Sequence, residues 1–251
     1  MAASSSRKGL YKVAPTDNSI DNTTIDIIAI HGLGTESPRT WEFKRRGDSR
    51  VVNWLSDKNM LPAVVPEARI FTYDWNANYF ENAPVQTLLS HAENLLAHVG
   101  GEQGSISRPI IFIASCFGGL VLAEAINRAA QEGSSYRHVL LNTAGIVFLA
   151  TPFRGSDGAK QAQWQVVVGG IMGNETSTQL VEGLNSNDKE LRKLTQTLAE
   201  LIHRDTVRLP ICCFYETEKT EMLKRLLSAD LASRVSAILK KKTKKIVCCI
   251  S

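Results

Sequence analysis

Residues 111–120 read IFIASCFGGL, and this stretch decides the fold that the sequence predicts. Apolar residues typical of a strand run up to Ala114, and an alanine-rich helical pattern begins directly behind a pair of glycines. This order of strand, sharp turn and helix is typical of a nucleophile elbow, whose usual pattern is G-x-S-x-G. Here Ala114 takes the first glycine position, Cys116 takes the serine position and Gly118 keeps the last. The stretch predicts a cysteine nucleophile; the alternative is an inert, buried Cys116.

A cysteine in this turn has favourable chemistry for nucleophilic attack. The positive end of the helix dipole lowers the pKa of a thiol at a helix N-terminus and raises its thiolate fraction. A thiolate attacks carbonyl carbon without a strong partner base. The backbone N–H of the next residue, Phe117, is expected to help hold the oxyanion that develops.

Five apolar runs have the composition of strands: residues 25–30, 68–73, 109–114, 144–150 and 210–215. They lack strict alternation of apolar and polar residues, which is typical of strands buried on both faces. Helical patterns lie between them, at residues 85–99, 120–130 and 180–202. Strands that alternate with helices predict a mostly parallel sheet with helices on both faces.

Ligands bind at the carboxyl ends of the strands in such sheets. The residues that follow the five runs are therefore expected to share one edge, and several carry reactive or polar groups: His31, Asp74, Cys116, Thr151 and Glu216.

The composition limits the classes of function. The chain has 251 residues, is 43% apolar and 22% charged, and carries a net charge of +4. Five lysines between residues 240 and 245 account for the excess, so nucleic-acid binding is not expected. The five cysteines lack the spacing of a disulfide framework or zinc site, and nothing indicates a cofactor, metal or nucleotide. We expect a flexible tail over residues 1–22, one domain over 23–239 and a basic tail over 240–251.

Several stretches together resemble a known family. They lie between about residues 9 and 225, and the most telling are 25–34 (IDIIAIHGLG), 108–120 (RPIIFIASCFGGL), 145–155 (GIVFLATPFRG) and 213–217 (CFYET). The chain resembles the α/β-hydrolase family that includes the serine-active-site-containing proteins. It is still more similar to the lipase-like N-terminal domains of fungal NLR-type (STAND) proteins.

The resemblance implies an α/β-hydrolase fold and a role for individual residues. Cys116 matches the nucleophile, Phe117 and Leu33 match the two oxyanion donors, and Glu216 matches the acid. The implied activity is hydrolysis of an ester, thioester or lipid-like acyl group, with a small-molecule or lipid-like acyl substrate as the partner.

One part of the pattern is missing. The order in this fold is nucleophile, acid, histidine, yet all five histidines precede Glu216. The sequence therefore predicts a fold without the last strand and its histidine loop. His31 is a candidate proton acceptor, although a histidine before glycine in this loop usually shapes the loop. Three explanations are open. The chain is a weak thiol-based hydrolase that works without the base, it is a catalytically impaired signalling or interaction module, or the gene model stops early and hides the histidine.

The last residues suggest a modification. Cys248-Cys-Ile-Ser251 has a cysteine four residues from the end and a terminal serine, which is the pattern of a farnesylated protein. The neighbouring lysines supply the second signal that stable membrane binding needs. We expect a cytoplasmic protein with peripheral association at intracellular membranes, such as those of the mitochondrion or endoplasmic reticulum. The alternative is a packed helix followed by an incomplete strand over residues 246–250. The sequence does not predict the oligomeric state.

Overall fold

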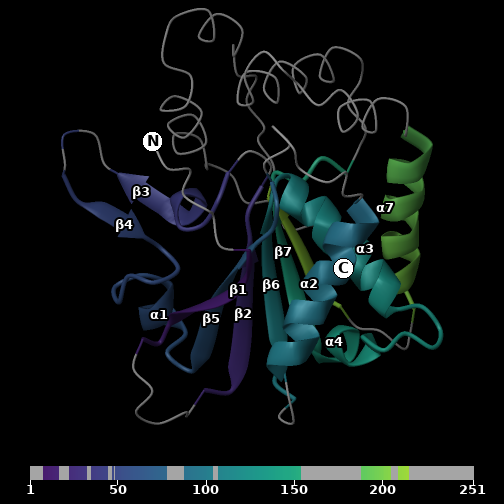
Figure 1. Ribbon diagram of the computed structural model, residues 1–251, viewed down its shortest axis with the longest axis horizontal. Helices are drawn as coiled ribbons and strands as arrows, with labels where there is room; N and C mark the ends of the chain where they lie inside the picture. Colours follow the sequence, from purple (N-terminus) through teal and green to yellow (C-terminus); the bar gives the residue numbers. More distant parts are fainter. Residues whose placement is uncertain are drawn as a thin grey trace, which may run out of the picture.

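The computed structural model describes residues 8–16, 23–32, 35–44, 47, 49–77, 88–103, 107–153, 188–204 and 209–214. The main element is a six-stranded sheet with the order β1-β5-β2-β6-β7-β8 (Figure 1). Its strands are β1 (Gly9–Ala14), β2 (Ile25–Ile30), β5 (Ala68–Asp74), β6 (Ile110–Ser115), β7 (Thr143–Leu149) and β8 (Ile211–Phe214). All five predicted strands are present. Every pairing among them is parallel, and β1 alone runs antiparallel, against β5.

Strand β1 corrects the prediction of a flexible tail over residues 1–22. Residues Gly9–Ala14 pair along the edge of β5, with Leu10 opposite Tyr73. The strand lies at the edge of the sheet: Ala14 is buried, Leu10, Tyr11 and Val13 are partly covered, and Lys12 is exposed.

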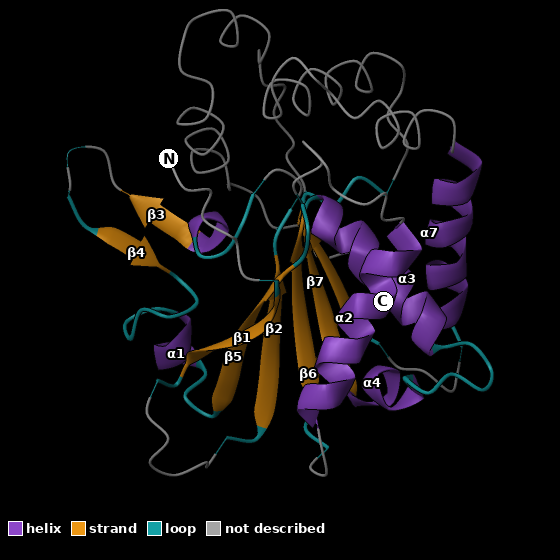
Figure 2. Ribbon diagram, in the orientation of Figure 1, coloured by secondary structure: helices purple, strands orange, loops and turns teal. Residues whose placement is uncertain are grey.

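The helices gather on one face of the sheet: α2 (Leu88–Gln103), α3 (Phe117–Ala129), α4 (Arg137–Asn142) and α7 (Asp188–Ile202) (Figure 2). Their apolar residues and the side chains on that face of the sheet form one continuous buried core. Asn127 of α3 donates to the Leu194 carbonyl of α7 over 3.0 Å and ties the two helices together.

The second face carries shorter elements: the 3-10 helix η1 (Arg39–Trp41), β3 (Glu42–Lys44), β4 (Val51–Asn53) and α1 (Leu61–Val64). Trp41 and Leu55 are buried there against Ile27, Ala29 and Ile70 of the sheet. Among the described residues the longer helices therefore lie on one face, whereas helices were predicted on both; the second face is covered by the β3–β4 pair and the short η1 and α1.

Candidate active site

Cys116 lies at the junction of β6 and α3, in the strand–turn–helix arrangement that the sequence predicts. Its backbone has φ 53° and ψ −126°, which a residue with a Cβ rarely adopts. The Cys116 N–H donates to the Leu149 carbonyl of β7 over 2.8 Å, so the neighbouring strand holds the turn. The side chain is half-buried, and the conformation is that of a nucleophile elbow.

The two glycines behind Cys116 let α3 begin against the sheet. A Cβ at Gly118 would overlap the backbone carbonyl of His31, and a Cβ at Gly119 would overlap the Thr151 side chain. Both helix positions therefore require hydrogen in place of a side chain.

The loop after β2 lies directly on the elbow. A Cβ built on Gly32 would come within 2.9 Å of the Cys116 Cβ and 3.5 Å of its Sγ. Phe117, the predicted oxyanion donor, is the first residue of α3, so its N–H has no carbonyl partner inside the helix. The other predicted donor, Leu33, and the predicted acid, Glu216, lie outside the described residues, as does Cys248.

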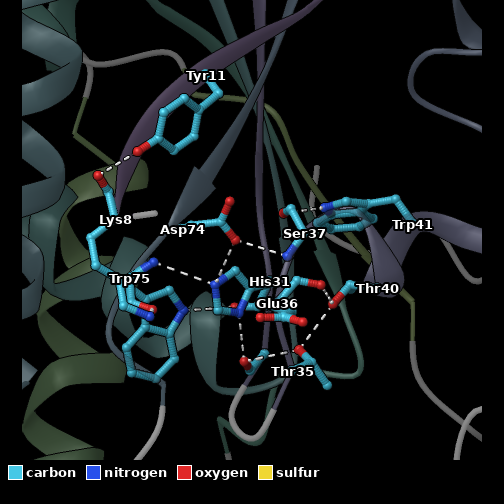
Figure 3. Close-up of polar contacts among 11 residues, drawn as sticks. Lys8, Tyr11, His31, Thr35, Glu36, Ser37, Thr40, Trp41, Asp74 and Trp75 are labelled. Carbon is cyan, nitrogen blue, oxygen red and sulfur yellow. Dashed lines mark hydrogen bonds and ion pairs between the residues drawn. The ribbon is translucent and has the colours of Figure 1, made fainter. Parts of the chain in front are cut away.

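His31, the candidate proton acceptor, is 1% exposed; its side chain contacts Gly32 of its own loop, Asp74 at the end of β5 and Trp75, the next residue (Figure 3). Its Nδ1 donates to the Gly32 carbonyl over 2.8 Å, because a carbonyl can only accept. Its Nε2 lies 3.2 Å from Asp74 Oδ1 and 3.3 Å from the Trp75 backbone nitrogen. Both ring nitrogens therefore have partners among the described residues, and these contacts favour loop shaping over proton transfer.

The other four histidines are also described. His91 of α2 is 2% exposed and packs edge-on against the Trp75 ring at 4.8 Å. Burial lowers the pKa of His91 to about 4, so this ring is neutral at pH 7. His98 and His138 each contact a backbone carbonyl of their own segment through Nδ1. His138 and His203 precede β7 and β8, which places them toward the edge of the sheet opposite Cys116.

Asp74 contacts the loop beside Cys116, a function that sequence reasoning did not assign to it. It is the last residue of β5, and this position at the carboxyl end of a strand was the only available signal. Its partner Ser37 is 37 residues away in the chain, and no local pattern reveals such a contact.

Within the described ranges, no group of three His, Cys, Asp or Glu side chains is arranged to hold a metal ion. In the same part of the chain, no helix has both the length and the apolar character needed to cross a bilayer.

No protein-family model matches the sequence. A relative among curated proteins is Protein SERAC1 from Danio rerio, which is 25% identical over 164 residues, 59% of this chain. That match covers 25% of SERAC1, so the chain spans about a quarter of this relative's length.

Among solved structures, the mature lipase BlEst2 of Bacillus licheniformis superposes with a TM-score of 0.51 at 15% identity. The match covers 80% of this chain and 70% of the lipase. Its propeptide form gives 0.50 at 14% identity, over 81% of this chain and 38% of that one. Together with the strand order and the elbow, these likenesses show that the chain has the α/β-hydrolase fold.

Proposed function

We propose that this protein cleaves ester or thioester bonds of acyl compounds, with Cys116 as the nucleophile. The observation that carries the proposal is the backbone of Cys116, with φ 53° at the start of α3. A strained, half-buried thiol is costly unless the surrounding structure holds it, and such strain is concentrated at functional sites. The solved structure with the same fold is described as a lipase, which agrees with an acyl substrate.

The proposed reaction has two stages. The Cys116 thiolate attacks the acyl carbonyl, and the Phe117 N–H, with the predicted Leu33 N–H, stabilises the negative oxygen of the tetrahedral intermediate. The intermediate collapses to a thioester on Cys116, and the alcohol or thiol departs with the proton that the Cys116 thiol gave up when it formed the thiolate. Water then attacks the thioester, which releases the carboxylic acid and restores the thiol. In this scheme Glu216 is the acid that orients a base.

Apolar residues beside the elbow support a lipid-like acyl group. Phe117 is buried and stacks on Trp75, with 5.6 Å between the ring centroids. Phe153, which follows β7, packs edge-on against Phe148 at 4.7 Å and is only partly buried. Aromatic side chains at the edge of the nucleophile turn favour an acyl chain over a charged substrate.

The test combines a thiol-directed activity probe with hydrolysis of p-nitrophenyl esters of increasing chain length. We expect labelling and turnover in the wild type, loss of both in Cys116→Ala, and retention of both in Cys213→Ala. Cys213 is a matched control because it is also half-buried, on β8. A folded wild type that is neither labelled nor active would overturn the proposal and favour a signalling or interaction module.

A further inference from the structure

The β3–β4 pair forms a small antiparallel sheet of its own on the second face of the molecule. Phe43 lies opposite Val52 and Lys44 lies opposite Val51. Among the described strands, neither β3 nor β4 pairs with the six-stranded sheet. Figure 2 shows the β3–β4 pair standing apart from that sheet, on the opposite side of the molecule from α7. Much of the surface of this pair is therefore left to solvent.

The β3–β4 pair exposes apolar side chains on both of its faces. Phe43 is 45% exposed and Val51 is 49% exposed. Successive residues of a strand point to opposite faces, so Phe43 lies on the face of Val52, and Val51 lies on the face of Lys44. Among the phenylalanine, tyrosine and tryptophan side chains that the structure describes, Phe43 alone is exposed.

Cations surround these apolar side chains. Residues 44–50 read KRRGDSR, with four cationic residues and one acidic residue, so this short stretch carries +3 of the chain's net charge of +4. Lys44 is exposed, and the Arg50 side chain is 62% exposed at 2.9 Å from Asp57. An ion pair with this exposure is weak, so a phosphate group can compete for the guanidinium.

The β3–β4 pair is fixed to the edge of the main sheet that carries the nucleophile elbow. Before β3, the Ser37 N–H donates to Asp74 at the carboxyl end of β5 over 2.8 Å. Trp41 is 2% exposed, and its carbonyl accepts from the Trp54 N–H over 3.1 Å. Cys116 follows β6 at the same edge, because β5, β2 and β6 are parallel.

We infer that the β3–β4 pair is a docking site for an anionic phospholipid surface. An aromatic and an aliphatic side chain beside several cations match both parts of such a surface, because the apolar groups enter the headgroup boundary while the cations meet lipid phosphates. The inference goes beyond the proposed function and does not depend on it. Docking would bring the edge that carries Cys116 to the lipid surface.

The test is co-sedimentation of the full chain with phosphatidylcholine vesicles, with and without about 30% phosphatidylserine. We expect the wild type to bind the vesicles that contain phosphatidylserine, and to bind less as salt is added. Lys44→Glu changes the charge by two and should weaken binding by about tenfold. Phe43→Ser removes the aromatic anchor and should weaken binding by about fivefold. An unchanged midpoint of urea denaturation shows that both variants fold.

Two matched controls make the same changes elsewhere. Lys193→Glu reverses an exposed charge on α7, and Val64→Ser removes an apolar side chain of α1 that is 77% exposed. Both should bind as the wild type does, and so should Cys116→Ala, which separates docking from catalysis. The lysines of residues 240–245 are present in every variant, so they cannot produce a difference between them.

Two results would overturn the docking site and leave the proposed function untouched. One is equal binding by the wild type and the two β3–β4 variants, or an equal fall in the controls. The other is a wild type that stays in the supernatant with both kinds of vesicle, which would favour a protein partner for this surface.

Discussion

At the scale of single residues, the unusual backbone of Cys116 depends on close packing around it. A left-handed, strained residue of this kind costs roughly 1–3 kcal/mol, which its surroundings must offset. The Leu149 carbonyl holds the Cys116 N–H, and the glycines that follow let α3 touch His31 and Thr151. The turn is therefore stable only while the residues at positions 118 and 119 have no side chain.

Substitution of these glycines should destabilise the protein. Gly118→Ala would press a methyl group into the His31 backbone, which cannot rotate away, so we expect a loss of about 2 kcal/mol or more in the free energy of unfolding. Gly101→Ala in α2 is the control, because a Cβ there meets nothing within 4 Å and should stabilise the helix by about 0.5 kcal/mol. Urea denaturation measures both. Equal stability of Gly118→Ala and wild type would contradict the packing described.

Gly119→Ala tests a single side-chain contact, because a Cβ at this position would meet the Thr151 side chain and not the backbone. The added methyl group would overlap Thr151, whose Oγ1 is buried without a hydrogen-bond partner among the described residues. We expect Thr151→Ala to recover part of the stability that Gly119→Ala loses, by about 1 kcal/mol in a double-mutant cycle. Simple additivity of the two substitutions would show that they do not share this contact.

His91 should make stability depend on pH. Its pKa falls from 6.5 to about 4 on folding because the neutral ring is buried beside Trp75. Between pH 4 and pH 6.5 the unfolded chain binds more protons than the folded protein. The free energy of unfolding contributed by His91 is therefore fully present above about pH 6.5 and declines as the pH falls toward 4. The loss is on the order of 3 kcal/mol. Urea denaturation across this range should give a smaller slope in His91→Phe; an unchanged slope would exclude His91 as its source.

At the scale of elements, one buried ion pair joins two central strands. Asp26 of β2 pairs in register with Arg69 of β5, and the guanidinium donates to both carboxylate oxygens over 2.7 and 2.8 Å. Asp26 is 1% exposed and Arg69 is 13% exposed. Since a buried carboxylate that loses its cation is strongly destabilising, this pair constrains the register that later aligns His31 with Asp74.

Arg69→Met should therefore lower the free energy of unfolding by about 3 kcal/mol, because it leaves the buried Asp26 carboxylate without the guanidinium. The control is Arg50→Met. The ion pair of Arg50 with Asp57 has a similar distance of 2.9 Å, but the Arg50 side chain is 62% exposed and its loss should cost less than about 1 kcal/mol. Similar losses in the two variants, measured by chemical denaturation, would contradict this difference.

At the scale of the whole molecule, the sheet gathers the site from distant parts of the chain. Its central strands were predictable, because strands buried on both faces are dense apolar runs such as Ile25–Ile30. The elbow was predictable because its requirements lie within a few consecutive residues around Cys116. Strand β1 was not predicted: an antiparallel edge strand is only partly covered, and its partner β5 lies about 60 residues along the chain.

In the candidate site, too, local features could be predicted from the sequence and contacts between distant residues could not. The sequence placed His31 and Asp74 at one edge of the sheet, since both follow apolar runs. It left open whether His31 shapes the loop or accepts a proton, and the contacts of both ring nitrogens within the loop favour the first role. The bond from Ser37 to Asp74 could not be predicted, because it depends on how the loop folds back over β5.

The measurement that tests the central claim most directly is mass-spectrometric mapping of the protein after brief exposure to p-nitrophenyl acetate. We predict one acetyl group on the peptide that contains Cys116, bound as a thioester and therefore removed by hydroxylamine. The adduct should be absent from Cys116→Ala, while the half-buried Cys212 and Cys213 remain unmodified. A folded protein that carries no acyl group on Cys116, or carries it equally on Cys212 and Cys213, would contradict the assignment of Cys116 as the nucleophile.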